Sequence, residues 1–172
     1  VNCLNTTDGD LCNNCENCLQ NIDEEIDIIE IDAASNNGVD EIREIRNNVK
    51  LMPVHLKYKV YIIDEVHMLS TSAFNALLKT LEEPPKHVIF ILATTEFNKI
   101  PATVISRCQK FDFEKIPPEL IEKQLNYILK KENKIINKDI VSFIAKMSDG
   151  GMRDAINMLD QVIALNDKNI LS

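Results

Sequence analysis

The chain has 172 residues, of which 45% are hydrophobic and 27% are charged, and its formal net charge at pH 7 is −8. This composition supports a packed core and excludes a disordered tail. The acidic balance, with a pI of about 4.9, argues against sequence-independent nucleic-acid binding by the isolated chain, although it leaves room for a local contact inside an assembly. No apolar run reaches the roughly 18 residues of a membrane helix, and no signal-peptide pattern is present, so we expect a cytoplasmic protein with no membrane partner.

Cysteines cluster at the start of the chain with the spacing C-x8-C-x2-C-x2-C, formed by Cys3, Cys12, Cys15 and Cys18. In a cytosolic chain such a cluster more often holds a metal than forms disulfides. Four thiolates satisfy tetrahedral Zn²⁺ and give a closed, structural site. Free thiols and an iron–sulfur cluster are the alternatives. Cys108 stands alone and is predicted to be a small buried side chain.

Four runs of the chain have the composition of β-strands: Ile26–Asp32, Lys59–Val66, Val88–Thr95 and Gln109–Phe113. The second and third are almost wholly apolar and β-branched, which is typical of strands buried on both faces. Helical patterns lie between them, at Val39–Met52, from the N-cap Ser70 to Pro84, and at Ile100–Ser106. Because strands alternate with helices, we predict an α/β fold with a parallel, three-layer sheet.

The pattern changes after Phe113, where Ile116, Pro117 and Pro118 form a natural linker. Only helical stretches follow, at Glu119–Asn133, Lys138–Met147 and Gly151–Asn166. Each has an apolar stripe, which predicts a small all-α domain. We therefore expect a cysteine module at 1–20, an α/β core at 21–116 and a helical domain at 117–172.

The run KVYIIDEVH ends an apolar strand in two adjacent carboxylates, Asp64 and Glu65. It has the form of a Walker B motif, and the carboxyl edge of an open parallel sheet is where ligands bind. Asp64 is suited to hold Mg²⁺, because hard cations prefer oxygen ligands, and Glu65 is suited to orient and deprotonate a water. An ordinary solvated strand end is the alternative. His67, a single histidine after a strand, is predicted to make structural hydrogen bonds.

Further polar residues follow in the segments LATTE, ISRC and GGMRD. Either Thr94 or Thr95 can point into a site at the strand end, but not both, because side chains alternate. On this segment alone, ordinary threonines at a strand end are the favoured interpretation. The planar fork of Arg107 suits phosphate, although an exposed arginine is usually a solvated charge. Arg153 lies in the first turn of a helix, where a cation opposes the macrodipole, so we expect a nearby acid or an anionic ligand to hold it.

These motifs together carry a family resemblance. The stretch Glu30–Asp160 resembles the γ/τ subunits of the bacterial DNA polymerase III clamp loader, which are AAA+ ATPases. The matching segments are EIDAASNNGVDEIR, YKVYIIDEVHMLS, FNALLKTLEEPPKHVIFILATTE, KIPATVISRCQ with FDF after it, and GGMRDAINMLDQ. The cysteine spacing also matches that family's zinc module. The resemblance implies a partial AAA+ sheet of the P-loop NTPase type, followed by a helical lid domain.

The resemblance implies a role for each candidate residue. Asp64 and Glu65 match the Walker B acids, and Thr95 matches the sensor-1 position, with Thr94 as the second choice. Arg107, in the Ser-Arg-Cys motif, matches an arginine finger that acts on the ATP of the neighbouring subunit. Arg153 matches sensor 2, which touches the γ-phosphate from the lid, and the four clustered cysteines match the zinc ligands.

One part of the family pattern is missing. A P-loop has the form G-x4-G-K-[ST], and none of the four glycines in this chain precedes a lysine. In the family, the P-loop strand and helix come before the zinc module, so we expect the chain to be a fragment whose P-loop lies upstream of Val1. Binding of ATP and Mg²⁺ then needs that loop, and the chain alone is expected not to hydrolyse ATP.

The loop Ser35, Asn36 and Asn37 precedes a helix, whose free backbone N–H groups form an anion site. In related clamp loaders this region faces the primer–template DNA, whereas a capping loop without a DNA role is the alternative. The resemblance implies an ATPase motor subunit that loads the sliding clamp onto primed DNA, with the clamp, the DNA and other clamp-loader subunits in a ring as partners. The alternative is a non-hydrolysing stator subunit that contributes only an arginine finger and structural contacts.

Overall fold

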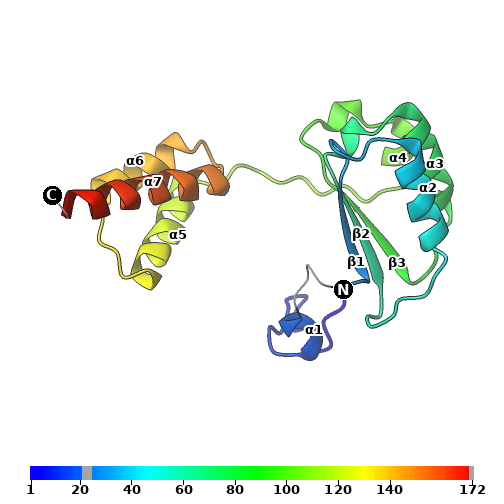
Figure 1. Cartoon of the computed structure of the whole chain (residues 1–172), viewed down its shortest axis with the longest axis horizontal. Helices are drawn as coiled ribbons and strands as arrows, with labels where there is room; N and C mark the ends of the chain where they lie inside the picture. The colour runs from blue at the N-terminus through cyan, green and yellow to red at the C-terminus, as the bar shows by residue number, and fades with distance from the viewer. Residues whose placement is uncertain (21–24, 171–172) are drawn as a thin grey trace. The chain divides into compact units, whose positions relative to one another are not determined.

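The computed structural model describes residues 1–20 and 25–170, which form two compact units that divide between Lys110 and Phe111 (Figure 1). The first unit holds the cysteine segment and the sheet, and the second holds helices. The outer limits predicted for the core and the helical domain, residues 21 and 172, lie outside the described residues. Among the helices described, none is both long enough and apolar enough to cross a membrane.

The first unit is built on a parallel sheet of three strands, which confirms the predicted α/β class. β1 (Ile28–Asp32), β2 (Lys59–Asp64) and β3 (Val88–Leu92) lie side by side in that order. Asp32 is in register with Asp64, and Ile63 is in register with Leu92. The strands therefore end at a common edge of the sheet, where the residues that follow them become neighbours.

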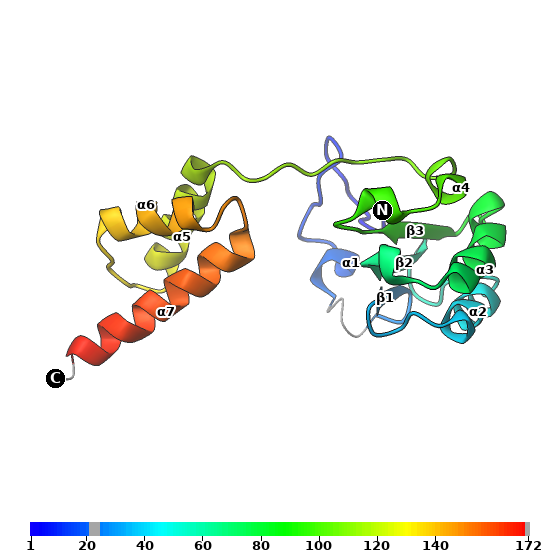
Figure 2. The ribbon, with the colours of Figure 1, turned by 90° about the horizontal axis from the view of Figure 1, so that it is seen from above.

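Helices cover one side of this sheet. α2 (Val39–Asn48), α3 (Thr71–Glu82) and the short α4 (Ala102–Ile105) all lie on that side (Figure 1, Figure 2). The core between helices and strands includes side chains that are at most 1% exposed, namely Ile42, Tyr61, Ile63, Leu77 and Val104. Full burial of an aliphatic side chain stabilises a fold by about 1.5–3 kcal/mol. On the opposite side of the strands, Glu30 is exposed and Ile91 is 48% exposed.

Local chemistry sets the ends of α3 where the sequence predicts them. Ser70 accepts a hydrogen bond from the N–H of Ala73 at 3.2 Å, as an N-cap does. Pro84 and Pro85 follow the last helical residue, Glu82, and cannot continue the helix. This helix therefore begins and ends where the sequence predicts.

The two central strand predictions are too long. The strands predicted to reach Val66 and Thr95 end at Asp64 and Leu92. For the first of these strands the reason lies at Glu65, whose backbone leaves the extended conformation for the left-handed region. The polar residues after each strand lie outside the regular strand and are free of its strict alternation of side chains.

The prediction of a strand at Gln109–Phe113 is wrong for the described part of the chain, where this segment has no strand structure. A strand is stable only when a neighbour pairs with its backbone, and the sheet ends at β3. Phe111 is 69% and Phe113 is 96% exposed, so the segment buries little apolar surface. Cys108, predicted to be buried, is exposed.

The second unit packs α5 (Pro118–Lys131), α6 (Lys138–Met147) and α7 (Met152–Ile170) around a core of its own. This agrees with the predicted helical lid. The core includes Ile121, Leu125, Val141, Ile144, Ala155 and Leu159. Gly150 links α6 to α7 with φ +84°, and a Cβ at this position would lie 2.6 Å from the Cβ of Lys115. Both the backbone angle and the close approach require glycine there.

A buried carboxylate, Asp27, holds the amino end of the sheet together. Its side chain is 0% exposed and accepts hydrogen bonds from the N–H groups of Val54, His55 and Leu56 at 2.7–2.9 Å. Burial by itself raises the pKa of Asp27, but these donors and the charge of Lys59 outweigh it and leave the pKa below its ordinary value. The carboxylate thereby ties the segment before β2 to the segment before β1.

We predict that Asp27→Asn destabilises the chain by about 2–4 kcal/mol, because the amide turns N–H groups toward backbone donors. Since the folded pKa is lowered, the contribution of Asp27 is present above about pH 4 and is lost as the pH falls through the folded pKa. Urea unfolding of the wild type and Asp27→Asn should therefore differ most at neutral pH and converge in acid. Asp40→Asn, at an exposed residue of α2, is the control, and equal losses in the two variants would contradict this role.

Candidate functional site

Backbone hydrogen bonds hold the segments that follow the three strands against one another. The N–H of Ala93 donates to the carbonyl of Ile63 at 2.9 Å, and the N–H of Val66 donates to the carbonyl of Ala93 at 2.9 Å. The N–H of Ala33, after β1, donates to the carbonyl of Asp64 at 3.0 Å. The segments after the three strands are therefore joined by hydrogen bonds at one edge of the sheet, where Asp64 and Glu65 lie.

Glu65 has a left-handed backbone, with φ 46° and ψ 43°. For a residue with a Cβ this conformation costs about 1–2 kcal/mol. The cost is offset by the burial of Val66, which is 1% exposed, and by its hydrogen bond to Ala93. A single turn of 3₁₀ helix, η2 (Val66–Met68), follows at once. This tight turn places the side chain of His67 beside that of Glu65.

The carboxylate of Glu65 is held through one of its oxygens. The hydroxyl of Thr95 donates to Oε2 at 3.1 Å, and the N–H of Thr95 lies 3.4 Å from the same oxygen. Nδ1 of His67 lies 3.2 Å from it as well. Thr95 is therefore the threonine that touches the acid directly, and Thr94 reaches it only through the histidine.

His67 joins the ends of β2 and β3. Its side chain is 6% exposed, Nδ1 lies 2.9 Å from Oγ1 of Thr94, and Nε2 lies 3.2 Å from Oε1 of Glu96. Lys99 donates to Glu96 at 2.7 Å, and this hydrogen bond is the main cause that lowers the pKa of Glu96. The sequence predicted structural hydrogen bonds for His67 but not its contact with Glu65. Its place two residues after that acid, across a tight turn, is the signal that could have shown it.

Asp64 stands exposed at the end of β2, where its Oδ1 accepts a hydrogen bond from the N–H of Glu65 at 2.9 Å. Its neighbour in register, Asp32, accepts hydrogen bonds from the hydroxyl of Ser35 at 2.7 Å and the N–H of Ala34 at 2.8 Å. These bonds, that from the hydroxyl first, lower the pKa of Asp32. Two carboxylates at adjacent strand ends make a negative edge that suits a hard divalent cation.

The loop predicted to contact DNA is folded onto Asp32. The Ser35 hydroxyl donates to the carboxylate of Asp32, and the side-chain amide of Asn36 donates to its carbonyl at 3.1 Å. At the start of α2, a Cβ added to Gly38 would stand 2.3 Å from Oε2 of Glu41. A carboxylate of the chain itself therefore lies at this helix N-terminus. These contacts form a turn at the end of β1, and no side-chain cap is formed at Gly38, the N-cap of α2. The DNA role stays a prediction.

Arg107 makes its contacts with α3 and α4 rather than with the acids at the strand ends. Its guanidinium donates to Oε1 of Glu82 at 2.7 Å and to the carbonyl of Thr103. The side chain of Arg107 is 32% exposed and that of Glu82 is 48% exposed. An ion pair this open contributes about 0–1 kcal/mol, so a phosphate can displace Glu82 at little cost.

Arg153 belongs to the second unit, where it lies exposed in the first turn of α7. Asp149, one of the two acids considered as its partner, instead pairs with Lys115. Asp154 shares the first turn with Arg153. An anionic ligand is therefore still a possible partner for the positive charge of Arg153 at this helix start. The sensor-2 role of Arg153 stays a prediction.

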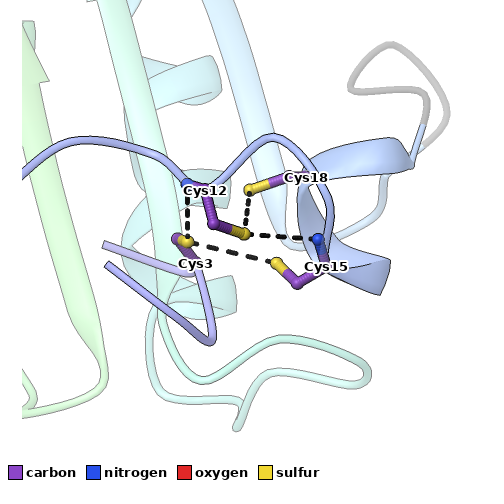
Figure 3. A group of neighbouring side chains, drawn as sticks. All are labelled: Cys3, Cys12, Cys15 and Cys18. Atoms are coloured by element: carbon purple, nitrogen blue, oxygen red, sulfur yellow. Dashed lines mark hydrogen bonds between the residues drawn. The ribbon is translucent and has the colours of Figure 1, made fainter. Parts of the chain in front are cut away.

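Figure 3 shows the four clustered cysteines around one centre, beside the short helix α1 (Glu16–Leu19). Their Sγ atoms all lie within 4.8 Å of one another. The Sγ atoms of Cys12 and Cys18 are 3.9 Å apart, and those of Cys3 and Cys15 are 4.0 Å apart. Four sulfurs bound at about 2.3 Å to one tetrahedral ion stand about 3.8 Å apart. The cluster could therefore hold a single metal ion, whereas an iron–sulfur cluster bridges several metal atoms and spreads its thiolates farther.

Backbone N–H groups point at these sulfurs. The N–H of Cys12 donates to Sγ of Cys3 at 3.5 Å, and the N–H of Cys15 donates to Sγ of Cys12 at 3.3 Å. A backbone hydrogen bond from Leu4 is the main cause that lowers the pKa of Cys15 to about 6, whereas contact with Cys15 raises the pKa of Cys18 to about 12. The cluster thus favours a thiolate, which is the form of cysteine that binds metal.

Asn2 attaches the cysteine segment to the sheet. Its Nδ2 donates to the carbonyl of Tyr58 at 3.0 Å, and its Oδ1 accepts from the N–H of Tyr58 at 2.9 Å. Asn17 donates to the carbonyl of Asn2 at 2.7 Å. Tyr58 directly precedes β2, so this segment sits at the amino end of the strand whose carboxyl end carries Asp64 and Glu65.

Comparisons with protein families match nearly the whole chain. A family model described as "DNA polymerase III, delta subunit" matches residues 1–117. A second, described as "DNA polymerase III clamp loader subunit, ATPase lid domain", matches residues 120–168. Together they cover both units of the structure.

Known proteins show the same likeness. The chain is 56% identical over 167 residues to the DNA polymerase III subunit tau of Bacillus subtilis, covering 96% of the chain and 30% of that protein. It is 51% identical over 173 residues to the subunit gamma/tau of Mycoplasma genitalium, covering 100% of the chain and 29% of that protein. The chain therefore spans about 30% of the length of these relatives.

Solved structures support the fold. A DNA polymerase III, gamma subunit-related protein from Thermotoga maritima matches with a TM-score of 0.51 and 24% identity, over 73% of this chain and 43% of that one. The RuvB Holliday junction branch migration motor of the same organism matches with a TM-score of 0.65 and 18% identity, over 78% of this chain and 45% of that one. At these identities the likeness shows a shared AAA+ type of fold. With the matches of both family models and of the tau and gamma/tau relatives, it follows that this chain belongs to the family of DNA polymerase III clamp-loader subunits.

Proposed function

We propose that this chain is part of an ATPase motor subunit of the clamp loader, acting within the DNA polymerase III holoenzyme. The observation that carries the proposal is the cluster at the strand ends, in which Thr95 holds Glu65 beside the exposed Asp64. In a ring of such subunits, ATP binding closes the ring so that it opens the sliding clamp and grips primer–template DNA. Hydrolysis then releases the clamp onto the DNA.

Asp64 and Glu65, at the carboxyl edge of the sheet, have different roles in this proposal. Asp64, exposed beside a second carboxylate, is the residue that would hold Mg²⁺, directly or through water. Glu65 is held through Oε2 and can present its other oxygen to an attacking water, whose proton it would take. The hydroxyl of Thr95 serves as sensor 1. ATP with its Mg²⁺ supplies the phosphoanhydride bond that is cleaved.

The two arginines act on phosphate from other positions. Arg107 is an arginine finger that serves the ATP bound to the neighbouring subunit, and its weak pair with Glu82 leaves it free to do so. Arg153, on the lid, contacts the γ-phosphate as sensor 2. A P-loop upstream of Val1 would hold the phosphates, so the 172 residues by themselves are inactive on this proposal.

The four cysteines would hold a structural Zn²⁺. Their sulfur spacing, the N–H groups that face them and the absence of an open ligand position among four thiolates support this assignment. The metal would keep the N-terminal segment folded, and the amide contact of Asn2 would fix that segment to the sheet. A weaker proposal remains for Ser35, Asn36 and Asn37, whose loop would face the DNA backbone.

The stator subunit is the second candidate. The description of the family model over residues 1–117 names a delta subunit, which favours it. The tau and gamma/tau relatives and the intact pair of Asp64 and Glu65 favour the motor. The sequence upstream of Val1 in the full-length protein decides between them, because a motor needs a P-loop there.

In the full-length protein, we predict that Glu65→Gln keeps ATP binding and slows hydrolysis by about 10²–10⁴-fold, because an amide cannot take the proton of the attacking water. Single-turnover hydrolysis and ATP affinity measure the two effects separately. Glu44→Gln, at an exposed position of α2, is the matched control and should match the wild type. Normal hydrolysis by Glu65→Gln would refute the role of Glu65, and a wild type that binds no ATP would favour the stator.

Arg107→Ala is predicted to slow hydrolysis in the assembled ring by about 10³–10⁵-fold, because the finger acts across the subunit boundary. ATP binding by the isolated subunit should stay unchanged. Arg43→Ala, which removes an exposed arginine paired with Asp40 on α2, is the control. A marked loss of ATP binding by the isolated Arg107→Ala subunit would rule out a role in trans.

Metal analysis of the full-length protein should find about one Zn per chain, since four thiolates fill one tetrahedral site. Cys15→Ser should lose it, whereas Cys108→Ser, outside the cluster, should keep it. Protein purified without chelators that contains no zinc would contradict the assignment, and iron in its place would support the iron–sulfur alternative.

A further inference from the structure

His67 lies in the strand-end cluster, and the proposed function gives it no task. Its side chain is 6% exposed, although imidazole is polar, and both ring nitrogens face side chains from the segment after β3 or from Glu65. Buried polar groups persist where they are paired. His67 is paired on both sides, with Thr94 and Glu65 at Nδ1 and with Glu96 at Nε2.

The chemistry of these partners goes beyond that of a structural histidine. Two of the three are carboxylates, and a carboxylate only accepts hydrogen bonds. The ring forms a hydrogen bond between Nδ1 and Oγ1 of Thr94, whereas the nearest oxygens of Glu65 and Glu96 each lie 3.2 Å from a ring nitrogen, which is the distance of an ion pair. Lys99 already pairs with Glu96 at 2.7 Å. The acid that depends more on the ring is therefore Glu65, the residue assigned to the water.

The other histidines of the chain show the contrast. Nε2 of His87 lies 3.1 Å from the carbonyl of Val49, which is a backbone contact of the ordinary structural kind. His55 lies 3.4 Å from Glu25, but its side chain is 54% exposed and it stands before β2, at the other end of the sheet. Only His67, of these three, is both enclosed and in contact with an acid of the proposed site.

We propose that His67 is a positioning residue for Glu65. Thr95 and His67 both meet Oε2, so they fix the carboxylate from two directions and leave Oε1 as the oxygen that faces the water. A glutamate without such partners samples several rotamers, and it loses this conformational entropy when it is held for the reaction. If the side chain is already confined, the entropy loss no longer adds to the activation barrier. Through Thr94 and Glu96, the ring also makes the orientation of Glu65 depend on the segment after β3. This inference rests on the proposed function, because Glu65 must act on water for its position to matter.

Two variants of His67 separate its two nitrogens. The side-chain amide of asparagine can replace Nδ1, and the longer glutamine can replace Nε2. His67→Asn therefore keeps a polar N–H group at the place of Nδ1, beside Thr94 and Glu65, and His67→Gln keeps one at the place of Nε2, beside Glu96. His55→Asn is the matched control, because it changes the same residue type beside a different carboxylate.

In the full-length protein assembled in its ring, His67→Gln should lower kcat by about tenfold or more while KM for ATP changes by less than about twofold. His67→Asn should recover most of kcat, and His55→Asn should match the wild type. If His67→Gln turns over like His55→Asn, or if His67→Asn is no better than His67→Gln, the positioning role is wrong. A merely structural role predicts equal losses in both His67 variants, with binding and turnover falling together.

A second measurement keeps the inference separate from the proposed ATPase activity. The ring ¹⁵N signals of His67, in the full-length protein labelled at histidine, should shift in Glu65→Gln, and those of His55 should not. Glu25→Gln should do the reverse, since Glu25 contacts His55. If the wild type hydrolyses no ATP, the proposed function fails, and the NMR arm still tests the contact. His67 signals that do not respond to Glu65→Gln would overturn the inference even in an active enzyme.

Discussion

The candidate site depends on the left-handed turn at Glu65. An extended backbone there would continue β2 and would carry His67 away from the acid along the strand direction. The turn instead begins η2 at once and buries Val66 in the hydrophobic core of the first unit. The strain of about 1–2 kcal/mol is thus balanced locally by burial and by one backbone hydrogen bond from Val66 to Ala93. Strained backbone held in this way is a feature of sites where a side chain must be aimed, and here the aimed group is a carboxylate.

The sequence predicts the strands, the capped helix α3 and the residues of the edge, because apolar runs and adjacent acids are local patterns. It does not predict which side chains meet, since that depends on register and turns. Thr94 and Thr95 look equivalent in LATTE, yet Thr95 alone contacts Glu65 directly once β3 ends at Leu92. His67 looks like an isolated histidine until the turn folds it back. The segment Gln109–Phe113 shows the converse case, because alternation makes a strand only where a neighbouring strand is available, and the described sheet ends at β3.

The two ends of the sheet have different physical roles. At the amino end, the buried carboxylate of Asp27 accepts hydrogen bonds from the segment before β2. The side-chain amide of Asn2 attaches the cysteine segment to Tyr58, directly before β2. At the carboxyl end, acids stand exposed and the backbone is strained. A four-thiolate metal has no open position for water, and its place at the amino end separates it from Asp64 and Glu65 by the length of the strand. Both facts argue that a metal there stabilises the fold and takes no part in the chemistry at the other end.

The charges at the carboxyl end explain why an assembly is needed on the proposed function. Asp32, Asp64, Glu65 and Glu96 gather around the strand ends, and the lowered pKa values of Asp32 and Glu96 keep those two ionised. The cation Lys99 contacts this group at Glu96, and the imidazole of His67 lies between two of its acids. Arg107, the cation suited to phosphate, is bound by Glu82 instead.

A negative edge of this kind repels a nucleotide until Mg²⁺ and cationic side chains from outside the cluster compensate it. The exposed pair of Arg107 with Glu82 is weak enough for a phosphate on a neighbouring subunit to compete for the guanidinium. Each subunit would then supply the cation that its neighbour's acids lack, which couples hydrolysis to closure of the ring.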